Sequence, residues 1–349
     1  MQGLLGYTIR RLLWVPFVLF IVSILAFSIT RFGPGDYIDV LAGVHRDEEA
    51  MERIRHERGL DRAVLPLTLS TDLPFLELHR TNQYSIYMKN LLTEGDFGES
   101  TTIYRGADVW DVIWPRILVS MQPGFVALVI AFSVGITVGI FAALRQGTWM
   151  DPLAISSFLL FQSIPVLVSL PFLILIFVVK LGWLPATGWG GPAVDVGPQE
   201  ISLGIFSRHI ILPAIALSLP GIAGIARLVR ATTLSVLGED YVRTARAKGL
   251  PELTVVSRHV MRNALLPLVT VVGLSLITLL EGAFFTELIL GIPGIGQLGV
   301  QAAQSRDYDV ILALVLILAA AFVLANIITD IAYTFIDPRI RYGQQQSGP

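Results

Sequence analysis

The residues between Glu239 and Pro267 have the composition of a docking surface rather than of a catalytic site. This stretch is polar and basic, and it lies between two long apolar segments. Glu239 and Asp240 precede a short run of helix-forming residues, where the helix dipole favours negative charge. Gly249 ends the run, as a C-terminal glycine does. The stretch therefore predicts a short helix whose small residues let a partner protein approach closely.

A second helix is expected directly after this break. Pro251 and Glu252 suit a first helical turn, and the chain then becomes apolar and enters the membrane. Residues 227–262 carry 7 Lys/Arg against 3 Asp/Glu. Because positively charged loops stay in the cytoplasm, we expect the docking helix on the cytoplasmic side.

No pattern for catalysis, nucleotide binding or metal binding is present. The sequence has no phosphate-binding G-x-x-x-x-G-K-[ST] loop, no G-x-S-x-G turn and no cysteine. None of the five histidines has a partner at a metal-ligand spacing. We therefore predict no catalytic residue, no metal site and no cofactor bound by this chain. No long apolar run carries a charge, whereas ion-coupled carriers usually have one, so an energy source for such a carrier is not encoded in this chain.

The composition is that of a membrane protein. Of 349 residues, 54% are hydrophobic and 15% are charged, with a mean hydropathy of +0.68. Soluble domains carry about 25% charged residues. The net charge of −2 argues neither for nor against a nucleic-acid partner, and the membrane class predicts none.

Six apolar runs approach or exceed the about 20 residues that cross a bilayer. They are residues 12–30, 117–144, 152–179, 210–226, 264–280 and 310–329. The first run exceeds the about 7–15 residues of a signal-peptide core, so we expect it to be a span that is retained. Six spans put Arg10, Arg145, residues 227–262 and Arg339 on one side, which is then the cytoplasm.

The spans divide the chain into four regions. Residues 1–31 form the N-terminal tail and first helix, and residues 32–116 form a long extracytoplasmic segment with a surface helix over 47–62. Residues 117–336 form the transmembrane core with a coupling loop at 227–263, and residues 337–349 form a cytoplasmic tail. Between residues 31 and 116, 8 Lys/Arg stand against 15 Asp/Glu, which fits the outer face.

Prolines interrupt the third and fourth spans. Pro165, Pro171 and Pro220 remove backbone hydrogen bonds, so these helices are expected to kink or to line a cavity. With Glu281 and Glu287, they are our candidates for a translocation path or gate.

Gly135 and Gly139 form a G-x-x-x-G pattern, which is either a close helix contact or a chance match in a glycine-rich helix.

The docking stretch resembles a known loop. YVRTARAKGL at 241–250 and RHVMRNALLP at 258–267 resemble the EAA loop of bacterial ABC-importer permeases, in the dipeptide, oligopeptide and nickel branch. Arg243 stands where the general pattern has glutamate, and Thr244 where it has the first alanine. The resemblance extends to SIP at 163–165, LGWLP at 181–185, Glu287 with PG at 293–294, and RDY at 306–308. Residues 67–83 are extra sequence relative to the family.

The resemblance implies an all-α integral membrane protein with six transmembrane helices in the type I ABC importer permease fold. It implies a place in the bacterial cytoplasmic membrane with both termini in the cytoplasm. The implied partners are a second homologous permease subunit, two ABC ATPases that hold ATP and Mg, and an extracytoplasmic solute-binding protein. The implied ATPase-coupling residues are Asp240, Tyr241, Arg243, Thr244, Ala245, Ala247, Lys248, Gly249 and Leu250.

The cargo is only weakly encoded in the sequence. An apolar path with few fixed charges suits chemically varied peptides, so the favoured function is peptide import. Nickel complexes and oligosaccharides are the alternatives within the same machinery. An ion-coupled secondary transporter is the alternative from another class.

Glu281 stands where the resemblance leads us to expect a small residue. If its carboxylate contacts cargo or the delivery protein, Glu281→Gln will lower the rate of uptake. If it is a solvent-facing acid at a helix end, uptake by Glu281→Gln will equal that of the wild type. A transport assay on the two proteins decides between these roles.

Overall fold

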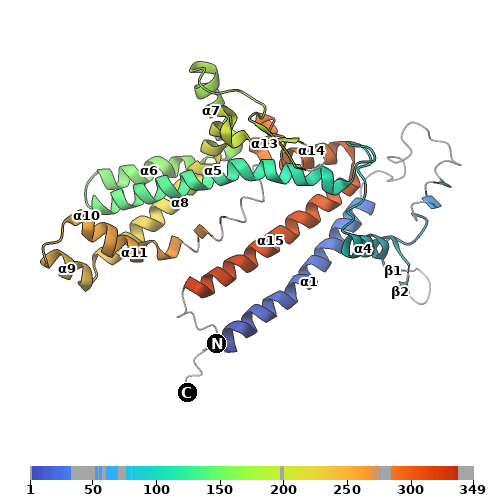
Figure 1. The fold of residues 1–349 in the computed structure, drawn as a ribbon, viewed down its shortest axis with the longest axis horizontal. Helices are drawn as coiled ribbons and strands as arrows, with labels where there is room; N and C mark the ends of the chain where they lie inside the picture. The colour runs from blue at the N-terminus through green and yellow to red at the C-terminus, as the bar shows by residue number, and fades with distance from the viewer. Residues whose placement is uncertain are drawn as a thin grey trace.

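Long helices dominate the structure (Figure 1). The computed structural model describes residues 2–32, 52–53, 55–56, 60–69, 76–79, 81–196, 200–268, 271–272, 275 and 284–336. Two groups of helices are visible. Helices α5 (Val109–Leu144), α6 (Met150–Ser163) and α8 (Ile211–Leu237) pack along one another, and α1 (Gln2–Phe32) pairs with α15 (Tyr308–Ile336).

Four helices of the described chain are long and apolar enough to cross a membrane. These stretches are Leu13–Phe32, Val109–Leu144, Arg208–Leu237 and Tyr308–Ile328. A fifth is formed if α6 and the segment Val166–Lys180 count as one span bent by 107°. The predicted span at 264–280 lies largely outside the described residues, so the count of six stays a prediction.

Two predicted boundaries were wrong. Helix α5 begins at Val109 rather than at 117, because the Asp108 side chain accepts a hydrogen bond from the Trp110 N–H and caps the helix. Helix α8 continues to Leu237 rather than ending at 226, so the first part of the predicted coupling loop is helical. In both cases an apolar-run criterion ends the helix at the first charged residue, whereas backbone hydrogen bonding continues past it.

The predicted break in the third span is confirmed at Pro165. Helix α6 ends at Ser163, and α7 (Val166–Leu173) starts after Pro165 and continues as a π-helical segment, η1 (Ile174–Lys180). Pro171 and Pro220 lie inside α7 and α8, which are not interrupted there. A proline pattern alone therefore overstated the number of breaks.

Short strands correct the all-α expectation. β1 (Leu67–Leu69) pairs antiparallel with β2 (Leu76–Leu78), within the predicted extra sequence. β3 (Ala193–Asp195) pairs antiparallel with β4 (Glu200–Ser202) between η1 and α8. Of the predicted surface helix at 47–62, only residues 52–53, 55–56 and 60–62 are described, and the first four of these are helical.

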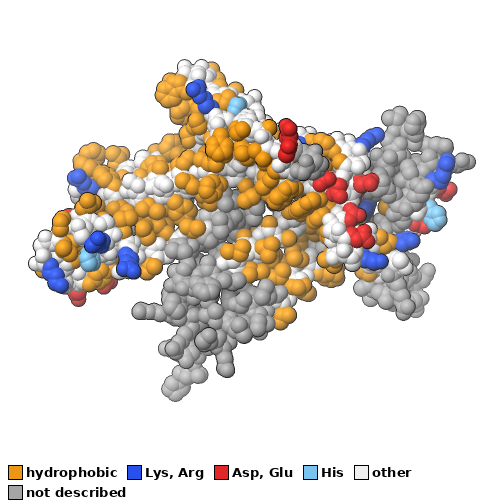
Figure 2. Space-filling view, viewed as in Figure 1, with side chains coloured by type: hydrophobic (Ala, Val, Ile, Leu, Met, Phe, Trp, Pro, Cys, Tyr) orange, Lys and Arg blue, Asp and Glu red, His pale blue; other side chains and the backbone are white. Residues whose placement is uncertain are grey.

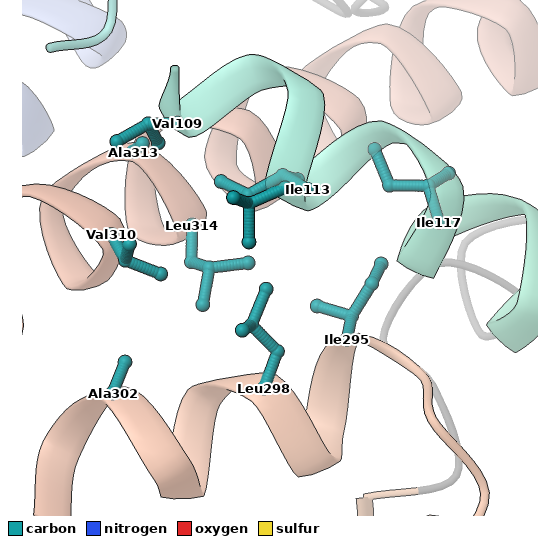
Figure 3. Packing of buried hydrophobic residues seen from close by; sticks show 10 residues of the cluster. Val109, Ile113, Ile117, Ile295, Leu298, Ala302, Val310, Ala313 and Leu314 are labelled. Carbon is teal, nitrogen blue, oxygen red and sulfur yellow. The ribbon is translucent and has the colours of Figure 1, made fainter. Parts of the chain in front are cut away.

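A hydrophobic core joins the N-terminal end of α5 to the C-terminal third of the chain (Figure 3). Helix α14 (Ile295–Ser305), longer than the predicted 298–303, lies between α13 (Phe284–Leu290) and α15. Leu298 of α14 packs between α5 and α15 and is fully buried. Helix α4 (Gln83–Glu94) contributes Tyr84 to a separate cluster with Phe27 of α1 and Leu312 of α15, and the Tyr84 hydroxyl is 2.6 Å from Ser23 Oγ of α1.

Charged side chains gather at the two ends of the molecule (Figure 2). Lys and Arg side chains group at the end that holds α9 (Asp240–Ala247), α10 (Glu252–Thr254) and α11 (Met261–Ala264). Asp and Glu side chains group at the opposite end, near α4 and α14, and hydrophobic side chains cover the length between. This distribution is the one expected of a helix bundle that spans a bilayer.

Helices α5 and α8 approach closely at Gly135 and Gly139. A Cβ on Gly139 would lie 2.7 Å from Val229 Cβ and 2.6 Å from the Ala226 carbonyl oxygen. A Cβ on Gly135 would lie 2.8 Å from Ile225 Cβ. Of the two interpretations of the G-x-x-x-G pattern, the close helix contact is confirmed.

Enlarging Gly139 is therefore expected to separate α5 from α8. We predict that Gly139→Val lowers the stability of the protein by about 1–3 kcal/mol, the usual cost of overpacking. Gly224→Ala on α8 is the control, since no heavy atom lies within 4 Å of a Cβ there. Thermal unfolding in detergent measures both variants, and equal midpoints for the two would contradict the contact.

Candidate functional site

Helix α9 is fixed to its own chain by one buried face. Val242 is 0% exposed and packs with Ala245 against Val255 and Val260, with Val236 and Leu237 of α8 at the edge of this cluster. The prediction had Ala245 among the small residues available to a partner. In the structure its side chain faces the following helical segment instead, so its role is to seat α9 closely on that segment.

Two side chains of α9, Tyr241 and Arg246, also hold the helix in place through hydrogen bonds outside this cluster. Asn263 Nδ2 donates to the Tyr241 hydroxyl at 2.7 Å, and that hydroxyl donates to the His259 carbonyl oxygen at 3.3 Å. Arg246 donates two hydrogen bonds to the Glu252 carboxylate, at 2.6 and 3.2 Å. The hydrogen bonds from Arg246 hold the pKa of Glu252 below its usual value. These contacts link α9 to the residues that follow the turn.

The turn between α9 and the next helix is made by a left-handed glycine. Gly249 has φ +74°, a conformation that side chains disfavour. Pro251 then precedes α10, a π-helical turn, η4 (Val255–Val260), and α11 in unbroken succession. The predicted order of short helix, break and second helix is confirmed.

The other face of α9 and its turn is exposed. Among the nine predicted coupling residues, eight have exposed side chains or backbone: Asp240, Tyr241, Arg243, Thr244, Ala247, Lys248, Gly249 and Leu250. Acidic, basic, aromatic and small groups thus lie together on a short helix supported from beneath. This arrangement can bind in a groove of another protein, and it holds no group placed for catalysis.

Glu287, which was predicted to lie on a translocation path or gate, is buried and hydrogen-bonded to other elements of the fold. Its side chain is 0% exposed and accepts hydrogen bonds from Ser120 Oγ of α5 at 2.6 Å and from the Gly296 N–H at 2.7 Å. Gly294 at the start of α14 has no side chain to cap the helix. The Glu287 carboxylate therefore supplies the cap from α13, and it does not face an open path in this structure.

The described candidates for a translocation path lie on different elements, and their role in a path stays a prediction. Pro165 and Pro171 are exposed on the broken span α6–α7, and Pro220 lies within α8. Glu281 lies outside the described residues. No group of three or more His, Asp or Glu side chains among the described residues could hold a metal ion.

Asp307 was not singled out as a site residue, although it lies in the RDY string. Its side chain is fully buried and accepts hydrogen bonds from Ser100 Oγ at 2.6 Å and from the Thr102 and Ile103 N–H groups at 3.1 Å. Burial alone would raise the pKa of Asp307, but the hydrogen bonds from Ser100 and these N–H groups outweigh it and hold the pKa below its usual value. This carboxylate fastens the loop at residues 100–103 to the start of α15.

Asp151 and Arg230 form an ion pair that spacing along the chain could not reveal. Arg230 Nε lies 2.5 Å from Asp151 Oδ1, and Nη2 lies 2.6 Å from Oδ2. Arg230 was assigned to a loop because the fourth span was predicted to end at 226. Both residues lie outside the predicted spans at 152–179 and 210–226, so the expectation of uncharged spans stays a prediction.

Comparison with known proteins places the whole chain among transport subunits. The family described as binding-protein-dependent transport system inner membrane component matches residues 135–342. The dipeptide transport system permease protein DppB of Alkalihalophilus pseudofirmus is 35% identical over 97% of this chain and 100% of its own length. The oligopeptide permease protein OppB of Haemophilus influenzae is 34% identical, and the glutathione permease protein GsiC of Escherichia coli K12 is 35% identical, each with the same coverage.

The buried Asp307 carboxylate predicts a dependence of stability on pH. Because its folded pKa is lowered, its stabilisation is present above the unfolded pKa of about 3.9 and is lost as the pH falls through the folded pKa. Asp307→Asn should cost about 1–3 kcal/mol at neutral pH and less below about pH 4. Unfolding midpoints measured across this range test the claim.

Asp108→Asn is the matched control, because asparagine caps a helix about as well as aspartate. Its midpoint should follow that of the wild type at every pH. If Asp307→Asn also follows the wild type, the carboxylate does not hold the loop.

Proposed function

This chain belongs to the family of binding-protein-dependent transport system inner membrane components, and on that premise we propose that it is the permease subunit of an ATP-driven peptide importer. The observation that carries the proposal is full-length similarity to three permease proteins named for dipeptide, oligopeptide and glutathione transport. It is a transport subunit of the inner membrane that crosses the bilayer several times.

The full architecture of the proposal is that of a type I importer permease with six transmembrane helices. The sixth helix of this proposal is the span that the sequence predicts at 264–280, and with six spans both termini lie in the cytoplasm with α9. The basic end that holds α9 to α11 supports this orientation, as does the acidic end near α4 and α14 (Figure 2). The core then comprises residues 117–336, extended at its start by the first turns of α5.

The proposed partners are a second homologous permease subunit, two ABC ATPases and an external solute-binding protein. ATP and Mg belong to the ATPases, since the sequence has no phosphate-binding loop of its own. The exposed face of α9 is the proposed contact with an ATPase groove. Support for this contact comes from the buried apolar face of α9 and from the hydrogen bonds of Tyr241 and Arg246. These contacts fix α9 to its own chain, so that it can transmit force without bending.

The mechanism is a two-state helix bundle driven by the ATPases. ATP binding closes the ATPase dimer and moves α9, and α8 follows because Val236 and Leu237 pack in the same cluster as Val242. Helix α8 is continuous over 27 residues, about 40 Å, so movement at its cytoplasmic end reaches the other side of the bilayer. The cavity opens outward, and hydrolysis returns it to the inward state.

The proposed cargo is a peptide, because three relatives of full length carry peptide or glutathione transport in their names.

Purification of the chain from native membranes, followed by mass spectrometry, tests the assembly. Recovery of two P-loop ATPases, a second permease and bound peptides is the expected result. Bound nickel or oligosaccharide would change the cargo, and uptake by the chain alone without ATP would replace the proposal with a secondary transporter.

The packing of α9 on the helical segment that follows it can be disturbed by a substitution at Gly249, which makes the turn between them. Gly249→Pro forces φ from +74° to about −65° and should uncouple ATP hydrolysis from uptake. Gly95→Pro is the matched control, since Gly95 ends α4 with φ +70° and also has no heavy atom within 4 Å of a Cβ. Cargo-stimulated ATPase activity and uptake are measured in proteoliposomes of the whole complex. Normal values for Gly249→Pro would refute the coupling role of the turn.

A further inference from the structure

An ion pair ties the cytoplasmic end of α6 to α8 close to the docking helix. Asp151 lies in the first turn of α6, and Arg230 lies seven residues before the end of α8 at Leu237, about 10 Å along the helix axis. The guanidinium meets the carboxylate through two parallel hydrogen bonds of 2.5 and 2.6 Å. Such two-point pairs fix orientation as well as distance.

The pair is partly withdrawn from solvent. The Asp151 side chain is 8% exposed and that of Arg230 is 31% exposed. Asp151 also lies at the N-terminus of α6, where the helix dipole favours its negative charge. Its contact with Arg230 is therefore screened less than a surface pair.

The position of the pair connects two features of the fold. On one side, α8 ends in the cluster that seats α9, through Val236 and Leu237. On the other side, α6 leads to the break at Pro165, where the span bends by 107°. The pair thus links α8, which carries the docking helix α9, to α6, which leads to the break at Pro165.

From this placement we infer that Asp151 and Arg230 are positioning residues that make α6 follow α8 when α9 is moved. The inference rests on the proposed function, because it assigns a route for the movement that the ATPases impose. Apolar packing of α6 on α8 resists separation but permits sliding, whereas the two-point ion pair opposes both. Movement of α9 therefore reaches the bent α6–α7 span directly.

Variants separate this role from a role in stability alone. Asp151→Asn or Arg230→Met leaves one charge without its partner, which destabilises a buried pair. The double variant Asp151→Asn/Arg230→Met leaves no unpaired charge, so its assembly and unfolding midpoint should return toward the wild type. Arg227→Met is the control, because Arg227 is exposed on the same helix one turn earlier.

The first experiment measures uptake per ATP hydrolysed in proteoliposomes of the complete complex with its binding protein, using radiolabelled dialanine and glutathione as probes. For the double variant we expect this ratio to fall about fivefold or more, with assembly retained, and for Arg227→Met to be unchanged. A double variant with the wild-type ratio would overturn the inference. A wild-type complex that shows no ATP-dependent uptake of either probe would instead overturn the proposed function.

The second experiment follows the helices directly. Because the chain has no cysteine, Ser156→Cys on α6 and Ser235→Cys on α8 place spin labels at two exposed sites outside the proposed ATPase contact, with cysteines of the other subunits replaced. The distance between the labels should be the same in nucleotide-free and ATP-trapped complexes. In the double variant it should change between the two states. A change of equal size with the ion pair intact would contradict the link.

Discussion

The close contact between α5 and α8 supports the rest of the described fold. Gly135 and Gly139 carry no side chain at this contact, so the backbone of α5 reaches Ile225 and Val229 of α8. Within lipid, helices gain little from the hydrophobic effect, and close backbone approach becomes a main source of association. Helix α6 packs on both partners, and α8 in turn carries α9.

Two buried carboxylates hold elements together at the end of the molecule opposite α9. Glu287 joins α13 to α14 and to Ser120 of α5, while Asp307 joins the loop after Ser100 to the start of α15. Each carboxylate accepts several N–H or O–H donors that would otherwise be buried without partners. Both belong to strings that resemble the family, and in this structure both carboxylates hold elements of the fold together.

At the end of the molecule that holds α9, apolar and polar contacts have different roles. Val242 and Ala245 hold α9 against the segment that follows it, and the contacts of Tyr241 and Arg246 fix its orientation. A docking helix that could tilt on its seat would absorb the movement of a partner instead of passing it on. The clusters and hydrogen bonds around α9 make the short helix a rigid extension of α8.

The sequence by itself determined the membrane class, most of the spans, the break at Pro165 and the helix–turn–helix of residues 240–264. These features depend on local composition and on neighbours along the chain, which a linear pattern records. Only the tertiary structure decided that Ala245 is buried, that Glu287 caps α14 and that Asp151 meets Arg230. Such contacts join residues 9 to 79 positions apart or depend on which face of a helix is covered. Helix ends at Val109 and Leu237 also escaped prediction, because backbone hydrogen bonds and a cap continue a helix beyond the point where its apolar run stops.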